Sequence, residues 1–259
     1  MPSDIAVEFA PAEESIEWAN RAIAELGDQI SKFFSGGVAE VVTHTNADTS
    51  QNVQKLKLTT DIPKDFRRKA TEALNNARHS FDQSVFAARN ILATKSNKGI
   101  NYPWARDPDD LDQLLDRRKI DSRLWDTIKS HEPYRTSDKY SGGNDLIRLL
   151  ATIANNKHTV GLTVDAVIAR TRYPTITGGP IQKLEVLRPV WNARTKEAEL
   201  IRWIGEAKIE GEYEFNLLMC LKDSRLPQPV SAVDALSDFT KHATDVCESI
   251  KAKCVELTQ

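Results

Sequence analysis

The sequence predicts an α+β protein with an N-terminal helical part, then an antiparallel strand-rich part and a C-terminal helix. Over most of residues 1–158, apolar residues recur at spacings of three and four, which is typical of helices. After residue 158 the apolar period changes to two, which is typical of strands. This segregation favours α+β over alternating α/β. We expect a mainly helical part at 1–158 with a hairpin at 38–60, and a strand-rich part at 159–259, together one compact unit.

The first half is predicted to contain five helices and one hairpin. The hairpin strands, 38–45 and 53–60, flank the polar turn segment NADTSQN. The clearest helix is the long one that opens after Pro63, because proline suits a first-turn position and an apolar stripe runs from Phe66 to Leu92. The predicted helices span residues 13–34, 64–94, 108–118, 122–131 and 144–157.

The second half is predicted to contain four strands and a closing helix. Alternating apolar residues indicate strands at 160–168, 181–187, 198–204 and 213–221. The three segments that link these four strands (TRYPTITGGP, RPVWNARTK and GEAKIEGE) are rich in turn-forming residues. Residues 232–255 then return to the helical period.

Composition excludes several classes of protein. A formal charge of -2 argues against a surface coated in basic residues for nucleic acid, although it leaves room for a local basic groove. No apolar run approaches the roughly 18 residues that indicate a membrane span. The N-terminal residues lack the basic and apolar regions of a secretion signal. Cys220, Cys247 and Cys254 show no disulfide or zinc-ribbon pattern, so we expect a cytoplasmic protein with reduced, buried thiols.

The common cofactor motifs are missing. The sequence has no G-x-G-x-x-G, no G-x-x-x-x-G-K-[ST], no G-x-S-x-G and no H-E-x-x-H. His44, His131 and His242 show no metal-ligand spacing. The acidic run at 107–112 opens a helix, where the helix dipole favours carboxylates. We therefore expect no cofactor and no metal.

The long helix carries a polar strip beside its apolar stripe. Arg78 lies at the edge of the apolar stripe and can pair with Asp82 four residues later. An arginine there could bind phosphate through its planar fork, with Asp82 and His79 orienting it. The other interpretation is a solvated helix face with an ordinary ion pair, which spacing alone favours. The strip comprises Asn75, His79, Asp82, Phe86, Arg89 and Asn90.

A second polar cluster, Asn155-Asn156-Lys157-His158, ends a predicted helix. Lysine and histidine in a last turn meet the negative end of the helix dipole, and asparagine suits a C-terminal cap. The functional interpretation makes His158 a general base or proton donor and Lys157 an anion anchor.

Four motifs in order resemble a widespread uncharacterised family of bacterial and phage-encoded proteins. In that family a helix with a pattern like LHNLRSALDHL is followed by an F-P loop, a Q-P-Y turn and a helix ending in LNNIDKHR, before a strand-rich half. The counterparts are ALNNARHSFDQSVF at 73–86, Tyr102-Pro103, Glu132-Pro133-Tyr134 and IANNKHT at 153–159. The resemblance covers about residues 64–168.

The family's helical motif is similar to the Arg-x4-6-His signature of HEPN domains, helical bundles that often cut or bind RNA. The resemblance carries the arginine to Arg78, the next polar residue to His79 and the aspartate to Asp82. It carries the later Lys-His pair to Lys157 and His158. The position of the signature histidine is occupied by Gln83, which cannot titrate. The chain therefore departs from the pattern at the residue that would take part in proton transfer.

Two functions follow as expectations. The first is a non-catalytic interaction protein of unknown partner, with the strand-rich half as its surface and Trp191 and Trp203 as candidate contact aromatics, although core packing is the commoner role of tryptophan. The partner would be a protein or RNA, with a homodimer also open and no membrane involved. The missing histidine and the acidic pI favour this function over the second.

The second function is a HEPN-like RNA-binding protein or metal-independent endoribonuclease. Arg78 would stabilise the phosphate, Asp82 would orient it, and His79 or His158 would transfer protons. The nucleic-acid-binding residues would be Asn75, Arg89 and Lys157.

Overall fold

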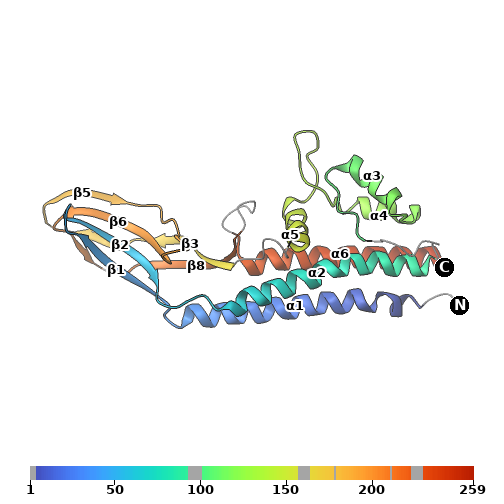
Figure 1. Ribbon diagram of the computed structural model, residues 1–259, viewed down its shortest axis with the longest axis horizontal. Helices are drawn as coiled ribbons and strands as arrows, with labels where there is room; N and C mark the ends of the chain where they lie inside the picture. Colours follow the sequence, from blue (N-terminus) through green and yellow to red (C-terminus); the bar gives the residue numbers. More distant parts are fainter. Residues whose placement is uncertain (1–3, 93–100, 157–163, 178, 211, 223–229) are drawn as a thin grey trace.

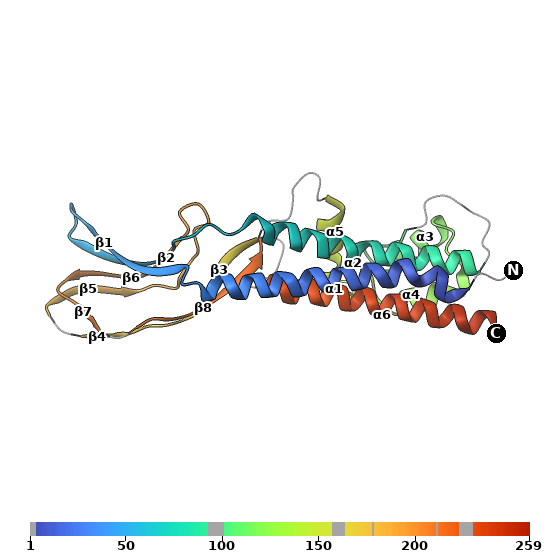
Figure 2. The same ribbon diagram turned by 90° about the horizontal axis from the view of Figure 1, so that it is seen from below.

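A computed structural model describes residues 4–92, 101–156, 164–177, 179–210, 212–222 and 230–259. The protein is elongated, with a helical bundle at one end and strands at the other (Figure 1). Three long helices, α1 (Ile5–Ser35), α2 (Lys64–Ile91) and α6 (Ala232–Thr258), lie side by side along the long axis (Figures 1 and 2). The shorter helices α3 (Pro108–Arg117), α4 (Trp125–Lys129) and α5 (Asp145–Asn156), with the 3-10 turn η1 (Ser122–Leu124), lie against this bundle.

Each long helix begins where the sequence supplies a suitable start. The Asp4 carboxylate accepts a hydrogen bond from Ala6 N at 2.9 Å, so α1 starts eight residues earlier than predicted and continues through Pro11. Pro63 precedes α2 as expected, and the Ser231 hydroxyl accepts from Asp234 N at the start of α6. The predicted α+β class is confirmed.

The bundle core is centred on Phe81 of α2. Its ring lies 4.9 Å from that of Tyr102, 4.7 Å from that of Trp104 and 5.5 Å from that of Phe239 on α6, measured between centroids. These four rings join α2, α6 and the segment before α3 in one cluster, so the C-terminal helix is part of the same core as the N-terminal ones.

Strands from distant parts of the chain share one sheet. Its order is β1 (Ala39–Asn46), β2 (Gln51–Leu58), β6 (Glu197–Gly205) and β5 (Ile181–Val186), all antiparallel. β3 (Val164–Arg172) pairs with β8 (Glu214–Leu221), and β4 (Thr175–Thr177) pairs with β7 (Lys208–Glu210). The sequence prediction missed β4 and β7, which are three residues each.

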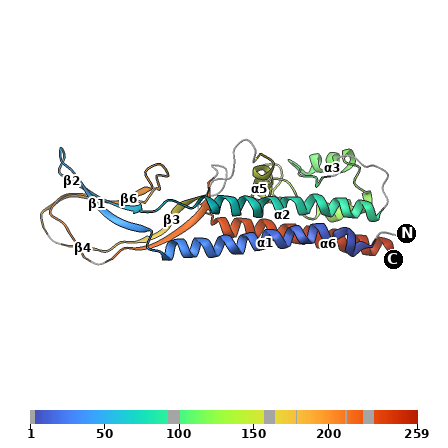
Figure 3. The same ribbon diagram turned by 60° about the horizontal axis from the view of Figure 1, so that its bottom comes forward.

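The strands of the second half form one long hairpin: β3, β4 and β5 make one arm, and β6, β7 and β8 make the other. Along its length Arg172 pairs with Glu214, Thr177 with Lys208 and Ile181 with Gly205. This hairpin then folds back on itself. Gly179 and Gly205 have φ of +72° and +99° at the bend, a conformation that favours glycine. Figure 3 shows the strands extending away from the bundle.

The folded-back hairpin packs against itself as two layers. Leu56, Leu200, Ile201 and Trp203 of the four-stranded sheet are buried and contact side chains of the β3–β8 and β4–β7 ribbon. Because β2 comes from the first half of the chain and β6 from the second, the spatial division into bundle and strands does not follow the division at residue 158.

Candidate interaction site at the strand-rich end

Arg78 and Asp82, the central pair of the predicted polar strip, lie together on α2. Arg78 Nη1 is 2.8 Å from Asp82 Oδ2 in an ion pair, and the guanidinium carbon lies 5.0 Å from the centroid of the Trp104 ring. Asp82 Oδ1 also accepts a hydrogen bond from Tyr102 N at 2.7 Å. Arg78 is only 9% exposed, so its charge is directed to protein groups.

Two further arginines hold the same segment, residues 101–105, against the bundle. Arg118 donates to the carbonyl oxygens of Asn101 and Tyr102, and Arg148 Nε donates to Ala105 O at 2.9 Å. Burial lowers the pKa of both guanidinium groups from the usual arginine value. Sequence analysis missed Arg118 and Arg148, and no spacing rule relates them to Arg78, because their common partner is a backbone segment.

The other predicted site residues spread along α2. Asn75 is half-buried, His79 is exposed and Arg89 is buried, with its guanidinium 5.8 Å from the Phe86 ring centroid. Lys157 and His158 lie outside the described residues. Among the predicted site residues that the structure describes, Arg78 and Asp82 are in direct contact.

The strand-rich end presents a held loop, residues 187–196, that joins β5 to β6. Asn192 organises it: its N–H donates to Glu197 O at 2.8 Å, and its carbonyl oxygen accepts from Lys196 N at 2.8 Å. The Asn192 side chain accepts from Arg194 N at 2.9 Å, and Leu58 N of β2 donates to Lys196 O at 3.0 Å. The loop is therefore tied both to itself and to the sheet.

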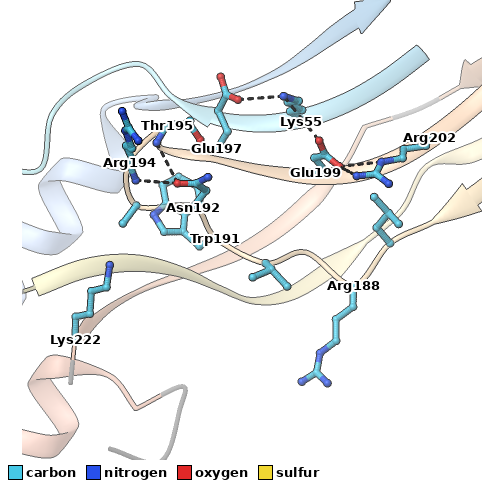
Figure 4. A pocket seen from close by; sticks show the side chains of 13 residues that line it. Lys55, Arg188, Trp191, Asn192, Arg194, Thr195, Glu197, Glu199, Arg202 and Lys222 are labelled. Atoms are coloured by element: carbon cyan, nitrogen blue, oxygen red, sulfur yellow. Dashed lines mark hydrogen bonds and ion pairs between the residues drawn. The ribbon is translucent and has the colours of Figure 1, made fainter. Parts of the chain in front are cut away.

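A hollow of about 860 Å³ opens beside this loop, with more positive than negative side chains around it (Figure 4). Lys55 lies between two carboxylates, 3.3 Å from Glu197 and 3.9 Å from Glu199, and Glu199 also pairs with Arg202. Five cationic and two acidic residues line the hollow, so an excess of positive charge remains after these pairs form. The cationic residues are Lys55, Arg188, Arg194, Arg202 and Lys222.

Arg188 and Arg194 carry this excess on the loop itself. Both are exposed, and within the part of the chain that the structure describes neither forms an ion pair. Arg188 points away from the Lys55 network (Figure 4). Lys222 differs, because its ammonium lies 3.4 Å from Asp165.

Apolar side chains accompany the two arginines. Val190 in the loop is 77% exposed and Val186 at the end of β5 is 55% exposed. A second hollow of about 720 Å³ lies between β3 and residues 187–191, and it shares Arg188, Val190 and Trp191 with the first. The loop therefore offers exposed positive and apolar groups between two depressions.

The two tryptophans proposed as contacts have different places. Trp203 is buried between the two strand layers. Trp191 is half-buried in the loop, and its indole N–H donates to Asp165 Oδ1 at 3.2 Å, which anchors the loop to β3. Trp191 therefore lines the surface and positions it, whereas Trp203 packs inside.

The described parts of the chain contain no metal site, no membrane-spanning helix and no reactive cysteine. No group of three or more His, Cys, Asp or Glu side chains there is placed to hold a metal ion. None of the described helices is long and apolar enough to cross a membrane. Cys220, Cys247 and Cys254 are buried free thiols, and burial raises the pKa of Cys220 to about 11, which disfavours the reactive thiolate.

The fold and this surface define a long helical bundle that carries a folded-back β layer with an exposed basic loop. Comparison with known proteins finds no match to a family model, a curated protein or a solved structure.

Proposed function

We propose that this chain is a non-catalytic interaction protein and that residues 187–196 bind an acidic protein partner. The observation that best supports this proposal is the exposure of Arg188 and Arg194, which form no ion pairs among the described residues. Both lie on a loop whose backbone is fixed by hydrogen bonds. A loop whose backbone is already held loses less conformational entropy on binding, and unpaired cations favour carboxylates of a partner. Val190 and the adjoining hollows supply apolar contact area.

The same proposal retains what the sequence resemblance implies: a cytoplasmic protein of the bacterial and phage-encoded family described above. An RNA partner and a homodimer remain alternatives to the acidic protein. The second function, a HEPN-like RNA-binding protein or metal-independent endoribonuclease, also stays a prediction. The burial of Arg78 and its contacts with Asp82 and Trp104 favour a structural role for that residue.

A binding assay with two polyanions tests the proposal. Fluorescence anisotropy is measured with a labelled poly-glutamate peptide and with a single-stranded RNA of equal charge. We expect the peptide to bind and the Arg188→Ala/Arg194→Ala double variant to weaken it by about tenfold or more, which corresponds to about 1.4 kcal/mol. The matched control is Arg21→Ala, which removes an exposed arginine of the bundle that is paired with Glu17.

Each outcome decides between the functions. Peptide binding that is equal in the double variant and the Arg21→Ala control contradicts the proposal, as does no binding at all. Preference for RNA, lost in the double variant, assigns the surface to RNA instead. RNA cleavage without metal that disappears in a folded Arg78→Ala variant supports the ribonuclease.

A further inference from the structure

In the part of the chain that the structure describes, β1 is an unpaired edge of the four-stranded sheet, and it differs from the opposite edge, β5. β1 has the sequence AEVVTHTN, with no Lys, Arg or Pro, and its pairing with β2 runs without a register shift over eight residues. At the other edge, β5 follows Pro180, carries Lys183 and has an irregular register between Ile181 and Lys183. Prolines, lysines and bulges are the usual means by which edge strands avoid pairing with another chain. The β5 edge thus has features that disfavour pairing with another chain, whereas the β1 edge has none of them.

The main-chain groups that face this open edge can be identified. Val38 O accepts from Thr59 N at 2.9 Å, while Leu58 N donates away from β1, to Lys196 O at 3.0 Å. Hydrogen-bonded and non-hydrogen-bonded pairs alternate along an antiparallel ladder. The N–H and C=O groups of alternate residues therefore point outward from the sheet. These residues are Ala39, Val41, Thr43 and Thr45.

The side chains of β1 also leave a partly uncovered apolar face. Val41 pairs across the sheet with Leu56, which is buried, so Val41 lies on the inner face, yet it is 36% exposed. A hollow of about 600 Å³ beside it is lined by Val41, Leu56, Tyr213 and Phe215, among others. Glu40 and His44 lie on the opposite face and are exposed.

We propose that β1 pairs antiparallel with β1 of a second copy of this chain, about a two-fold axis at Val42. In this register the outward-facing residues form four hydrogen-bonded pairs, Ala39 with Thr45 and Val41 with Thr43, each occurring twice. Every residue from 39 to 45 then has a partner, which uses nearly the whole strand.

The pairing of a hydrogen-bond acceptor with a donor across the strands favours this register and a second copy as the partner. Glu40 of each copy lies directly opposite His44 of the other, at non-hydrogen-bonded positions where side chains approach most closely. The carboxylate accepts a hydrogen bond from the imidazole, twice per dimer. Thr43 of the second copy covers the exposed Val41. Because a single strand edge buries less surface than a standard interface, the dimer is weak, with a dissociation constant in the micromolar range.

Sedimentation velocity over about 1 to 200 µM, the range in which such weak interfaces assemble, tests the proposal. We expect a concentration-dependent dimer. Thr43→Pro removes one outward N–H without removing a hydrogen bond to β2, and should weaken dimerisation by about tenfold or more. Thr43→Val keeps the N–H and should dimerise like the parent chain. Circular dichroism and melting confirm that both variants are folded.

Charge reversal gives an independent readout of the register. Glu40→Lys alone removes the carboxylate that accepts from His44, and His44→Glu alone places two carboxylates opposite one another, so each variant should weaken the dimer. The double variant Glu40→Lys/His44→Glu should restore it. A chain that stays monomeric at all concentrations overturns the inference, as does a dimer that none of these variants changes. The β1 edge and residues 187–196 are separate surfaces, so this inference and the proposed function can fail independently.

Discussion

At the scale of single residues, the Arg78 guanidinium lies between a carboxylate and an indole ring in the bundle. Removing one partner of a largely buried ion pair leaves the other charge uncompensated. We expect Arg78→Ala to lower the free energy of unfolding by about 2–4 kcal/mol, measured by urea unfolding, because the Asp82 pairing and the Trp104 contact are both lost.

The Glu17–Arg21 pair on α1 is a matched control for this prediction. It has the same i,i+4 spacing, but its side chains are 68% and 63% exposed. Arg21→Ala should cost less than about 0.5 kcal/mol. Equal losses for the two variants would show that burial of Arg78 contributes nothing to stability.

Two half-buried histidines, His242 on α6 and His131 beside it, give the fold a response to pH. The ring of His242 lies 5.6 Å from those of Phe81 and His131, and its Nε2 has no hydrogen-bond partner among the described residues. Burial, aided by His131, lowers the pKa of His242 to about 4 from 6.5, while Asp245 opposes the shift. As the pH falls from about 6.5 to about 4, the unfolded chain binds this proton and the folded chain does not. Stability present above pH 6.5 is therefore lost across that window.

Urea unfolding at pH 7.5 and pH 5 measures this loss, using His242→Phe for comparison. At pH 5 the shift corresponds to about 2 kcal/mol, at about 1.4 kcal/mol per pH unit below 6.5. The parent chain should lose about that much more stability between the two pH values than His242→Phe does. Identical losses in both proteins would assign the pH response to other groups.

At the scale of elements, the fold-back of the long hairpin depends on two glycines. Gly205 has φ of +99°, and a Cβ there would overlap Pro180 O across the bend. Gly205→Ala should therefore destabilise the strand-rich end by about 2 kcal/mol or more, with hydrogen exchange increasing in β5 and β6 before it increases in the bundle.

Gly27, in the middle of α1, provides the opposite case. The nearest side-chain atom to a Cβ built there is Val233 Cγ2 at 3.9 Å, an ordinary contact distance. Gly27→Ala should stabilise the protein by about 0.5–1 kcal/mol, since alanine loses less backbone entropy than glycine in a helix. If both substitutions shifted the melting temperature in the same direction, the structural distinction between these glycines would be wrong.

The elements themselves were largely predictable from the sequence, whereas their pairing was not. The apolar stripe of α2 and the polar turn between β1 and β2 are local patterns, and both elements form within a few residues of the expected bounds. The pairing of β2 with β6 joins residues more than a hundred positions apart, which no local period encodes. For the same reason, spacing could identify the Arg78–Asp82 pair, but it could not identify Arg118, Arg148 or the basic loop at 187–196.

At the scale of the whole molecule, both ends depend on contacts that are distant in sequence. α6 packs on both α1 and α2 and supplies Phe239 to the core around Phe81, while β1 and β2 gain their third strand from β6. The molecule is elongated, and among the described residues the short segments 36–38 and 59–63 join the bundle to the strands on either side of the β1–β2 hairpin (Figures 1 and 2).

The position of α6 in the bundle has a consequence for folding during synthesis. Because only the β1–β2 hairpin separates α1 from α2 in the sequence, we expect these helices to pair first. The apolar side chains that they turn toward α6 then stay open to water until that helix leaves the ribosome, well over a hundred residues later. Contacts of such long sequence separation form slowly, because the entropy of closing the loop opposes them first. The nascent chain therefore exposes the side of Phe81 that Phe239 later covers throughout the synthesis of the strands from β3 to β8, and such exposed apolar surface is what chaperones bind.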